Sequence, residues 1–466
     1  MSTGETPNRL SALRERASLT QQEVAVRLGA PVTAGQVSRW ERGEVVPVPR
    51  YRRMLAQVFG VSVAELGLPA TPPVPRSRSS AEDWFVADEQ DSRVVESQDR
   101  WRATRAALNA NRHQLAQVAA GLYPDHRLTD TGLIAGEGWI PDGPVDLAAV
   151  KLMEADASLS ALDGSEREAA RLLPDQSLMR PFPRYTTAVR DLARPRLFED
   201  RHAWRLVGVD WSAGSLAFGD GTYFGFADVF ESLAHELAYV ALDADGRPVP
   251  VPSLRDLPFR RLVGSPFDLG RRPVMPAVST LTIRRDGDAA EFLMHRRDPR
   301  AVAAAGGMLQ VIPSGIFQPS SLLPAARAAD FDLWRNIQRE LAEELLGMPE
   351  ADGHGRPVDY TSGPFGVLDE ARDAGRVRVW CLGVALDALT LVGEILTVLV
   401  ADADVFDHLA YDFVDRNDEG QVVAERFPFT AEGVRGLLGS GRVAPAGAGC
   451  LDLAWRWRDM LLPQQR

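Results

Sequence analysis

Hydrophobic residues recur at helical spacing near the start of the chain. In LTQQEVAVRLG, Val24 and Leu28 lie four positions apart, and in QVSRWERGE, Val37 and Trp40 lie three positions apart. Both spacings put the apolar side chains on one helical face, which predicts two helices packed through those faces. Because YRRMLAQVFG and SVAELG predict two further short helices, a five-helix all-α bundle is expected over residues 1–68.

Polar residues agree with this reading of the N-terminal segment. Thr20 is followed three positions later by Glu23, which is the spacing of a capping box at the start of a helix. Gln36 and Arg39 fall on the face opposite Val37, so we expect them at the surface. The predicted bundle therefore carries one polar, outward-facing helix.

The rest of the chain predicts a multidomain α+β organisation. Residues 69–83, rich in Pro, Ser and Arg, are typical of a linker, and residues 84–275 mix helical and strand patterns in an α+β middle domain without a readable role. There, the glycines of FGDGTYFGF are expected at a hairpin turn. In residues 276–466, strand patterns flank one amphipathic helix, which we expect to begin near Asp330 or Asp332 and to end at Gly347.

Charge is divided unevenly between these parts. The whole chain has a formal net charge of -12, but residues 1–68 contain nine Arg and six Glu, a net charge of +3, which leaves -15 for the remainder. This asymmetry is typical of a small DNA-contacting module joined to a larger acidic body. A protein that coats nucleic acid along its whole length is excluded.

Two further observations concern the cellular compartment of the protein. Cys381 and Cys450 are far apart in the sequence and predict neither a disulfide framework nor a metal cluster. The start, MSTGETPNRL, lacks the regions of a signal peptide, and the most apolar stretch is interrupted by Asp387 and Glu394. We therefore expect a cytoplasmic protein without a membrane partner.

Three motifs, LTQQEVAVRLG, QVSRWERGE and LAQVFGVSVAEL, carry a family resemblance. With them, the N-terminal segment resembles the helix-turn-helix of the Cro and phage-repressor type, the XRE family. The resemblance implies a bacterial transcriptional regulator that binds operator DNA as a homodimer, with the second helix of the motif in the major groove. The turn GAPVTAGQ is about two residues longer than is usual in the family, so the resemblance leaves open which residue begins that helix.

The same resemblance implies which residues touch DNA. Thr33 and Gln36 would contact phosphate or base edges near the start of the second helix, and Arg39 would read a base one turn later. Gln21 would anchor a phosphate at the start of the first helix, and Arg42 would make a second phosphate contact. The alternative is a protein-interaction bundle on which these side chains are merely exposed.

Three glutamates gather on the amphipathic helix of the C-terminal region. At about 100° per residue, Glu340, Glu343 and Glu344 fall within one arc beside the apolar stripe. The like charges of Glu340 and Glu344 cost about 0.2–0.5 kcal/mol unless something offsets them. Mg²⁺, which prefers oxygen ligands, would do so. A solvated acidic helix face is the alternative.

At these residues the chain resembles the Nudix family, which hydrolyses derivatives of nucleoside diphosphates. The matching residues are Arg339, Glu340, Leu341, Glu343 and Glu344, with Gly315 as the opening glycine. The resemblance implies a C-terminal Nudix-like α/β/α sandwich in which the three glutamates bind Mg²⁺. Arg339 would be a structural residue that orients a carboxylate, and Glu394 would be the general base for an attacking water.

The chain also departs from the Nudix signature. Ser321 stands where the first glutamate belongs, and seventeen residues, Leu322–Gln338, replace the usual seven. Two functions therefore stay open for this region. The first is a sensor of a nucleotide-like or phosphorylated metabolite within a transcriptional regulator, and the second is an active Nudix hydrolase with an accessory DNA-binding module.

Overall fold

The computed structural model forms two compact units, Met1–Val86 and Ala87–Arg466. It describes residues 9–28, 32–42, 45, 47, 49–68, 89–156, 160–195, 198–243, 246–251, 253–296, 308–349, 357–411, 413, 416–417, 420–421 and 424–463. In the described residues, no helix is both long enough and apolar enough to cross a membrane.

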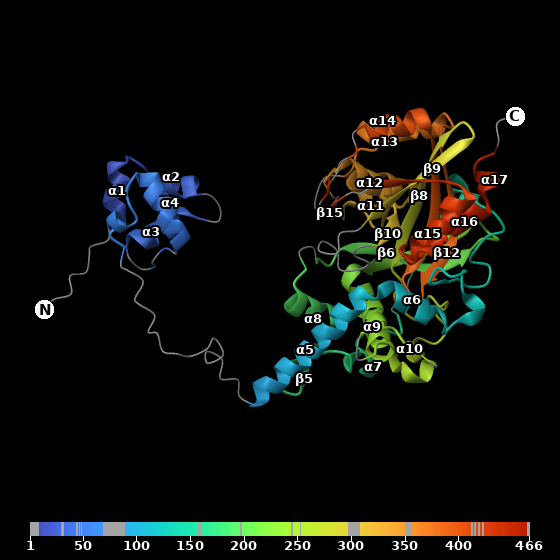
Figure 1. Cartoon of the computed structure of the whole chain (residues 1–466), viewed down its shortest axis with the longest axis horizontal. Coiled ribbons are helices and arrows are strands. Elements are labelled where there is room, and N and C mark those ends of the chain that lie inside the picture. Colours follow the sequence, from blue (N-terminus) through green and yellow to red (C-terminus); the bar gives the residue numbers. More distant parts are fainter. Residues whose placement is uncertain are drawn as a thin grey trace. The chain divides into compact units, whose positions relative to one another are not determined.

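The first unit is all-helical (Figure 1). Its α-helices are α1 Leu10–Arg16, α2 Gln21–Leu28, α3 Ala34–Glu41 and α4 Pro49–Phe59. Val24, Leu28, Val37 and Trp40 are buried together in its core, as the spacing predicts. Thr20 and Glu23 form the predicted capping box, since the Thr20 backbone N–H donates to Glu23 Oε2 at 2.7 Å and the Glu23 N–H donates to Thr20 Oγ1 at 3.2 Å.

The expected fifth helix of this bundle is a single 3-10 turn, Ala64–Leu66. Ser62 and Glu65 satisfy each other's backbone N–H groups at its start, and Gly67 ends it in a left-handed conformation at φ 61°. One turn is enough to bury Leu66 completely in the core. The last of the two short helices predicted to close the bundle is therefore a single 3-10 turn and not an α-helix.

The second unit is mixed α+β, as predicted. Its helices are α5 Glu89–Ala110, α6 Arg112–Ala120, α7 Arg167–Ala170, α8 Tyr185–Ala188, α9 Tyr223–Ala241, α10 Pro258–Val263, α11 Pro324–Asp330, α12 Leu333–Leu346, α13 Gly363–Asp373, α14 Ala403–Ala410, α15 Ala431–Gly439, α16 Pro445–Arg456 and α17 Arg458–Leu461. Its strands are β1 Leu133–Ile134, β2 Val145–Asp146, β3 Lys151–Glu154, β4 Asp175–Ser177, β5 Arg180–Pro181, β6 His202–Asp210, β7 Ser215–Thr222, β8 Pro276–Asp286, β9 Ala289–Arg296, β10 Leu309–Val311, β11 Ser314–Ile316, β12 Val377–Asp387, β13 Gly393–Asp402, β14 Arg416–Asn417, β15 Gly420–Gln421 and β16 Ala424–Pro428.

The largest sheet of this unit runs in the order β1-β12-β13-β8-β9-β10, with β2 on β12, β11 on β8 and β16 on β9. The long central strands β13 and β8 are parallel, whereas β12–β13 and β8–β9 are antiparallel. Strands β1 and β2 come from the predicted middle domain and pair with β12. The predicted boundary between residues 275 and 276 therefore falls inside one compact unit.

Helices cover both faces of this sheet (Figure 1). In β13, Ile395 and Leu399 pack into the hydrophobic cluster that contains residues of α12, α13 and α14. The alternate residues Leu396, Val398 and Val400 pack into the cluster that contains residues of α15 and α16. This alternation follows from the two-residue period of a strand.

A smaller sheet, β3-β7-β6, leads directly into the long helix α9. The glycines expected at a hairpin turn lie elsewhere: Gly219 and Gly221 are in β7, and Gly225 is in the first turn of α9. Gly221 is needed because a methyl group there would lie 2.3 Å from Cζ of Phe226. The close approach of this ring, and not a turn, accounts for the glycine.

Candidate functional site

Helix α3 presents polar residues at the surface of the first unit. Thr33 caps the helix, since its Oγ1 accepts a hydrogen bond from the Gln36 backbone N–H at 3.3 Å. The helix thus begins at Ala34, which answers the question left open by the long turn. Thr33 and Arg39 are exposed and Gln36 is half-buried, while the opposite face is buried in the core.

A partly buried ion pair holds the C-terminal end of α3 against α1 and α2. Arg14 donates to Glu41 through Nε at 2.5 Å, and Gln21 Nε2 donates to the same carboxylate at 2.7 Å. The hydrogen bond to Glu41 raises the pKa of Arg14. The amide of Gln21, predicted to anchor a phosphate, is therefore engaged inside the domain.

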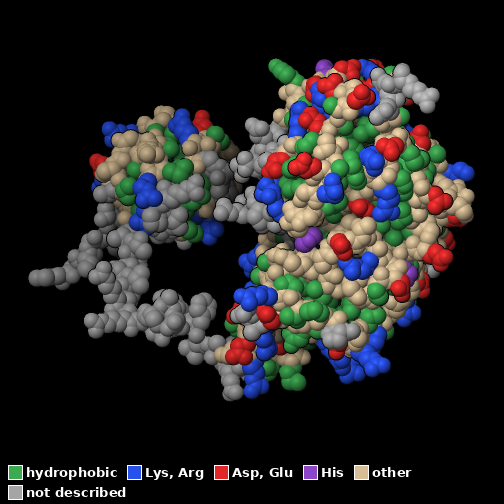
Figure 2. All heavy atoms as spheres, turned by 45° about the vertical axis from the view of Figure 1, so that its right-hand side comes forward, with side chains coloured by type: hydrophobic (Ala, Val, Ile, Leu, Met, Phe, Trp, Pro, Cys, Tyr) green, Lys and Arg blue, Asp and Glu red, His purple; other side chains and the backbone are tan. Residues whose placement is uncertain are grey.

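The exposed charged side chains on and near α3 include three arginines. The Glu41 side chain is only 7% exposed, whereas Arg27, Arg39 and Arg42 are exposed. Arg42 follows α3 directly, and its guanidinium donates to the Ser38 hydroxyl. Because Arg14 and Glu41 neutralise each other, their pair leaves the net charge of the unit unchanged, and Arg27, Arg39 and Arg42 place positive charge at its surface. On the second unit, by contrast, acidic and basic side chains are interspersed over the visible face (Figure 2).

In the second unit, α12 has the start and end expected from the sequence. Asp332 caps it by accepting from the Trp334 backbone N–H at 2.7 Å, and Gly347 ends it at φ 63°. Most of the extra residues before Arg339 form α11, a short helix that Pro324 begins. The stretch that is longer than the Nudix spacing thus contains a short helix of its own.

Arg339 is buried and bonds to the connection that leads into α12. Its Nη1 donates to Asp330 Oδ1 at 3.0 Å, and its Nη2 donates to the Gln318 carbonyl at 2.7 Å. Asp330 also accepts from the Ser320 backbone N–H at 2.7 Å, and both Arg339 and Asp330 bond to the Tyr360 hydroxyl. The carboxylate that Arg339 orients in these contacts belongs to Asp330.

Two of the three glutamates meet the strand that contains Gly315. Glu344 is buried, and its Oε2 accepts a hydrogen bond from the Ser314 backbone N–H at 3.0 Å. Glu340 lies over Gly315 so closely that a methyl group there would be 2.0 Å from the Glu340 carboxyl carbon. Glu343 is half-buried one turn along the same helix. The structure thus brings Gly315, Glu340 and Glu344 together.

The Glu394 side chain lies on the face of the sheet opposite to the one that Glu340 covers. It accepts a hydrogen bond from Ser279 Oγ at 3.1 Å. Gly315 is paired with Val278, the neighbour of Ser279. Because adjacent positions of a strand point to opposite faces, Ser279 and Glu394 share one face, and Glu340 lies on the other. The backbone therefore does not direct Glu394 toward Glu340.

The glutamates as they are placed do not fit the predicted Mg²⁺ site. In the part of the chain that the structure describes, no group of three His, Cys, Asp or Glu side chains is arranged to hold a metal ion. Glu344 instead satisfies a backbone N–H, and Glu340 packs on a glycine. The present contacts of both carboxylates are those of side chains that attach α12 to β11.

The sequence pattern did not indicate the carboxylate that accepts hydrogen bonds from three side chains of α12. Asp369 of α13 accepts hydrogen bonds from Trp334 Nε1 at 2.7 Å, Arg335 Nη1 at 2.7 Å and Gln338 Nε2 at 3.0 Å. Burial raises its pKa, but these hydrogen bonds outweigh that effect and the net pKa is lowered. The partners are more than thirty residues apart, so no local spacing could have revealed them.

Comparison with known proteins identifies the first unit. A sequence model described as a helix-turn-helix domain matches residues 8–68. The matched segment contains α1 to α4 and the Thr33-capped helix. The N-terminal unit is therefore a helix-turn-helix DNA-binding domain, which supports a role in transcription regulation. The comparison with curated proteins gave no match for the chain.

Proposed function

We propose that the protein is a transcriptional regulator of the XRE type, which binds operator DNA through α3. One observation carries this proposal. Arg39 and Gln36 lie on the outer face of a capped helix whose inner face is fixed by Val37 and Trp40 in the core of a matched helix-turn-helix domain. Such a helix can enter the major groove without unfolding any part of the domain.

The side chains have different roles in this proposal. Arg39 can donate two parallel hydrogen bonds to a guanine edge, and Gln36 can do the same to adenine. Thr33 and Arg42 contact phosphates, which sets the position of α3 on the duplex. Gln21 acts indirectly, because its amide holds Glu41 and thereby the end of α3.

A single helix-turn-helix domain supplies few contacts, so we propose that two copies bind a two-fold symmetric operator. The expected centre-to-centre separation of the half-sites is about 34–36 Å, one turn of the duplex. Footprinting of the selected operator measures this separation, and a protected region confined to one half-site would contradict the homodimer.

The experiment for DNA binding uses the full chain and a library of genomic fragments in a gel-shift selection. Arg39→Ala is expected to weaken binding to the selected fragment by about 1–3 kcal/mol, roughly 5- to 150-fold. Arg16→Ala removes an exposed arginine from α1 and serves as the matched control, with little effect expected. Absent binding, or binding indifferent both to Arg39→Ala and to salt, would contradict the regulator function.

A second proposal concerns the C-terminal region. We propose that it is Nudix-like and binds a nucleotide-like or phosphorylated metabolite, with hydrolysis as the alternative. The contact of Glu340 with Gly315 supports it, because the two parts of the signature adjoin despite the inserted helix. Any Mg²⁺ bound by Glu340, Glu343 and Glu344 would require these carboxylates to leave their present contacts.

Binding and turnover separate the two alternatives. The full chain is titrated with a panel of nucleoside diphosphate derivatives, with and without Mg²⁺, while release of phosphate-containing products is measured. Binding without turnover is expected, and Glu343→Gln should weaken it, whereas Glu370→Gln, on the exposed face of α13, should not. Turnover that Glu343→Gln abolishes would establish the hydrolase. Failure to bind any member of the panel would contradict both.

A further inference from the structure

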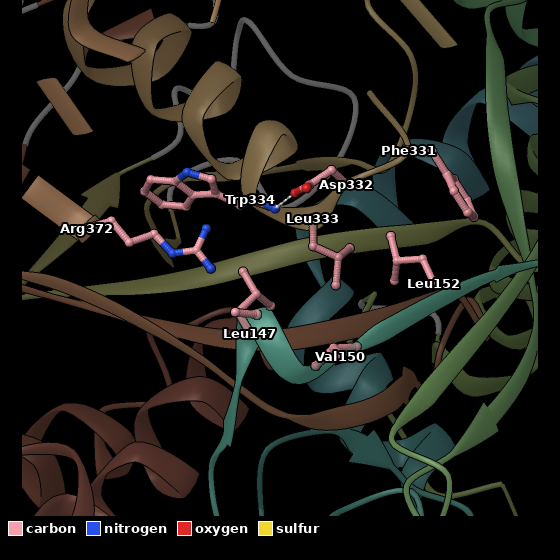
Figure 3. Close-up of a pocket in the computed structure, with 9 residues that line it drawn as sticks. Leu147, Val150, Leu152, Phe331, Asp332, Leu333, Trp334 and Arg372 are labelled. Carbon is pink, nitrogen blue, oxygen red and sulfur yellow. Dashed lines mark hydrogen bonds between the residues drawn. The ribbon is translucent and has the colours of Figure 1, made fainter. Parts of the chain in front are cut away.

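A cavity of about 260 Å³ opens at the start of α12 (Figure 3). One wall is the segment from Leu147 to Leu152, which comprises a 3-10 turn and the start of β3, and the other is the α11–α12 connection with Arg372 of α13. The lining residues are Leu147, Ala148, Val150, Leu152, Phe331, Asp332, Leu333, Trp334 and Arg372. Apart from Asp332 and Arg372, the lining residues are of apolar or aromatic type, while most of the surface that the lining exposes to the cavity is polar.

The one cation of this lining is Arg372. Its guanidinium carbon lies 5.1 Å from the centroid of the Trp334 ring, a cation–π contact that fixes the side chain at the cavity. Figure 3 shows the guanidinium projecting from α13 toward the side chains of the opposite wall. Across the residues that the structure describes, no carboxylate or carbonyl accepts a hydrogen bond from it. The cavity therefore offers guanidinium donors close to the side chains of Leu147, Leu152 and Leu333.

Asp332, the other charged residue of this lining, forms no ion pair with Arg372. Its carboxylate accepts hydrogen bonds from the backbone N–H groups of Trp334 at 2.7 Å and Arg335 at 3.2 Å, so it is committed to capping α12 (Figure 3). It also occupies the helix N-terminus, which leaves Arg372 as the group that can attract an anion. A ligand with two negative charges would meet one cation and the fixed Asp332 carboxylate, so a single negative charge matches the site better.

We propose that this cavity binds a small organic monoanion, with one carboxylate on Arg372 and an apolar body against Leu147, Leu152 and Leu333. A guanidinium pairs with a carboxylate through two parallel hydrogen bonds. A cavity of about 150 Å³ is sufficient for benzene, so about 260 Å³ accommodates a ring with a short carboxylate side chain. This ligand class differs from the phosphorylated metabolite proposed for the glutamate region.

Because the cavity lies between two segments of the second unit, a bound ligand could change how these segments are arranged. It would contact the Leu147–Leu152 segment and the α12–α13 pair at once, and would stabilise the arrangement in which they adjoin. The proposal that a ligand binds depends only on the cavity. The proposal that this ligand regulates the protein also depends on the proposed DNA-binding function.

Isothermal titration calorimetry on the full chain tests the binding. The probes are 3-phenylpropionate and 3-phenylpropanamide, which share their size and ring but differ in charge. We expect the acid to bind at least about tenfold more tightly than the amide, since a hydrogen bond to a charged group is worth more than a neutral one. Equal affinities, or no binding of the acid at millimolar concentration, would overturn the proposal.

Three variants locate the site. Arg372→Gln should remove the preference for the acid, and Ala148→Phe, at an exposed position of the rim, should fill the cavity and abolish binding of both probes. Arg376→Gln, which removes a nearby arginine that pairs with Asp404 outside the cavity, should leave both affinities unchanged. Binding of the acid that survives both Arg372→Gln and Ala148→Phe would show that it binds elsewhere.

The same protein separates this proposal from the one on DNA. Arg39→Ala should lose operator affinity and keep the affinity for 3-phenylpropionate. If the wild-type chain binds no DNA but discriminates the acid from the amide, the regulator function fails and the cavity stands. If it binds DNA but neither probe, the cavity proposal fails alone.

Discussion

Helices α3 and α12 are both amphipathic, and the polar face of each was predicted to be functional. They differ in how far their polar side chains are buried and hydrogen-bonded to neighbouring segments. In α3, Arg39 is exposed and Gln36 half-buried, Val37 and Trp40 are buried, and Glu41 at its end is held by Arg14 and Gln21. In α12, Gln338, Arg339 and Glu344 are buried and hydrogen-bonded to neighbouring segments. Arg39 and Gln36 of α3 therefore lie at least partly at the surface, whereas many of the polar residues of α12 hold the fold together.

The two helices show that internal contacts decide whether a polar motif can form a binding site. A polar pattern on a helix is evidence for a binding site only as far as its side chains are not used internally. The acidic signature on α12 meets this condition in part, because Glu344 satisfies the Ser314 backbone N–H. Residues such as Arg339 match the motif and are also required by the packing.

The sharpest test of this contrast is Arg339→Met. It leaves Asp330 buried without its cation, and breaking a buried pair in this way costs about 3–5 kcal/mol. Urea unfolding of the full chain, monitored on the transition of the second unit, measures the loss. Arg376→Met removes an arginine whose pair with Asp404 is largely exposed, and should cost at most about 1 kcal/mol. Equal effects of the two variants would contradict the structural role of Arg339.

The two units should also differ in their response to acid. The first unit contains no histidine, while His235 in α9 is buried and its pKa is lowered to about 4 by burial and by the nearby Arg105. Its neutral form is the one that fits the fold, so its contribution to stability is complete above about pH 6.5 and is lost as the pH falls toward 4. The slope is at most about 1.4 kcal/mol per pH unit.

Thermal unfolding at a series of pH values between 7.5 and 4.5 measures this slope for each unit. His235→Asn keeps a polar group beside the Tyr185 hydroxyl, which lies 3.1 Å from Nδ1 in the wild type, but does not titrate in this range. The variant should flatten the pH dependence of the second unit. An unchanged slope would show that other groups cause the acid sensitivity.

Removal of the α3 cap should act on the first unit only. Thr33→Ala deletes the hydroxyl that accepts the Gln36 N–H, and the loss of such a cap costs about 1 kcal/mol. The transition of the second unit should stay unchanged. Thr33→Ser keeps the hydroxyl and is expected to retain most of the stability, so a loss as large as that of the alanine variant would argue against capping.

The smallest expected effect is at Gly315→Ala. The added methyl group would overlap the carboxylate of Glu340, but that carboxylate is the end of a flexible, half-buried side chain and can rotate away. We expect a loss of less than about 1 kcal/mol, below the usual cost of about 1–3 kcal/mol for overpacking, because the obstructing carboxylate can move. In the Glu340→Ala background the same substitution should cost still less. Equal costs in both backgrounds would mean that Glu340 is not the obstacle.

Periodicity predicted the elements whose apolar face is continuous. Helices α2, α3 and α12 and strands β12 and β13 lie where their patterns indicate, because burial of one stripe or of a long apolar run decides their structure. Capping residues such as Asp332 indicated where the helices begin and end. The helix-turn-helix could be predicted in full outline for the same reason.

Long-range contacts could not be predicted in this way. The pairing of β1 and β2 with β12 joins segments more than two hundred residues apart, so the sequence pattern placed a domain boundary where the structure has one unit. Likewise, Glu41 and Asp369 receive donors from distant helices. Gly221 was misread because a glycine required by a ring and a glycine required by a turn look the same in a sequence.

The most direct test of the central claim is the affinity of the full chain for the selected operator with each base pair substituted in turn, for wild type and Arg39→Ala. If α3 reads the major groove, the wild type discriminates at each contacted position, and Arg39→Ala loses about 1–3 kcal/mol of discrimination at one position of each half-site. A uniform loss at all positions would show that Arg39 contacts only the backbone. Unchanged discrimination everywhere would contradict the account of α3.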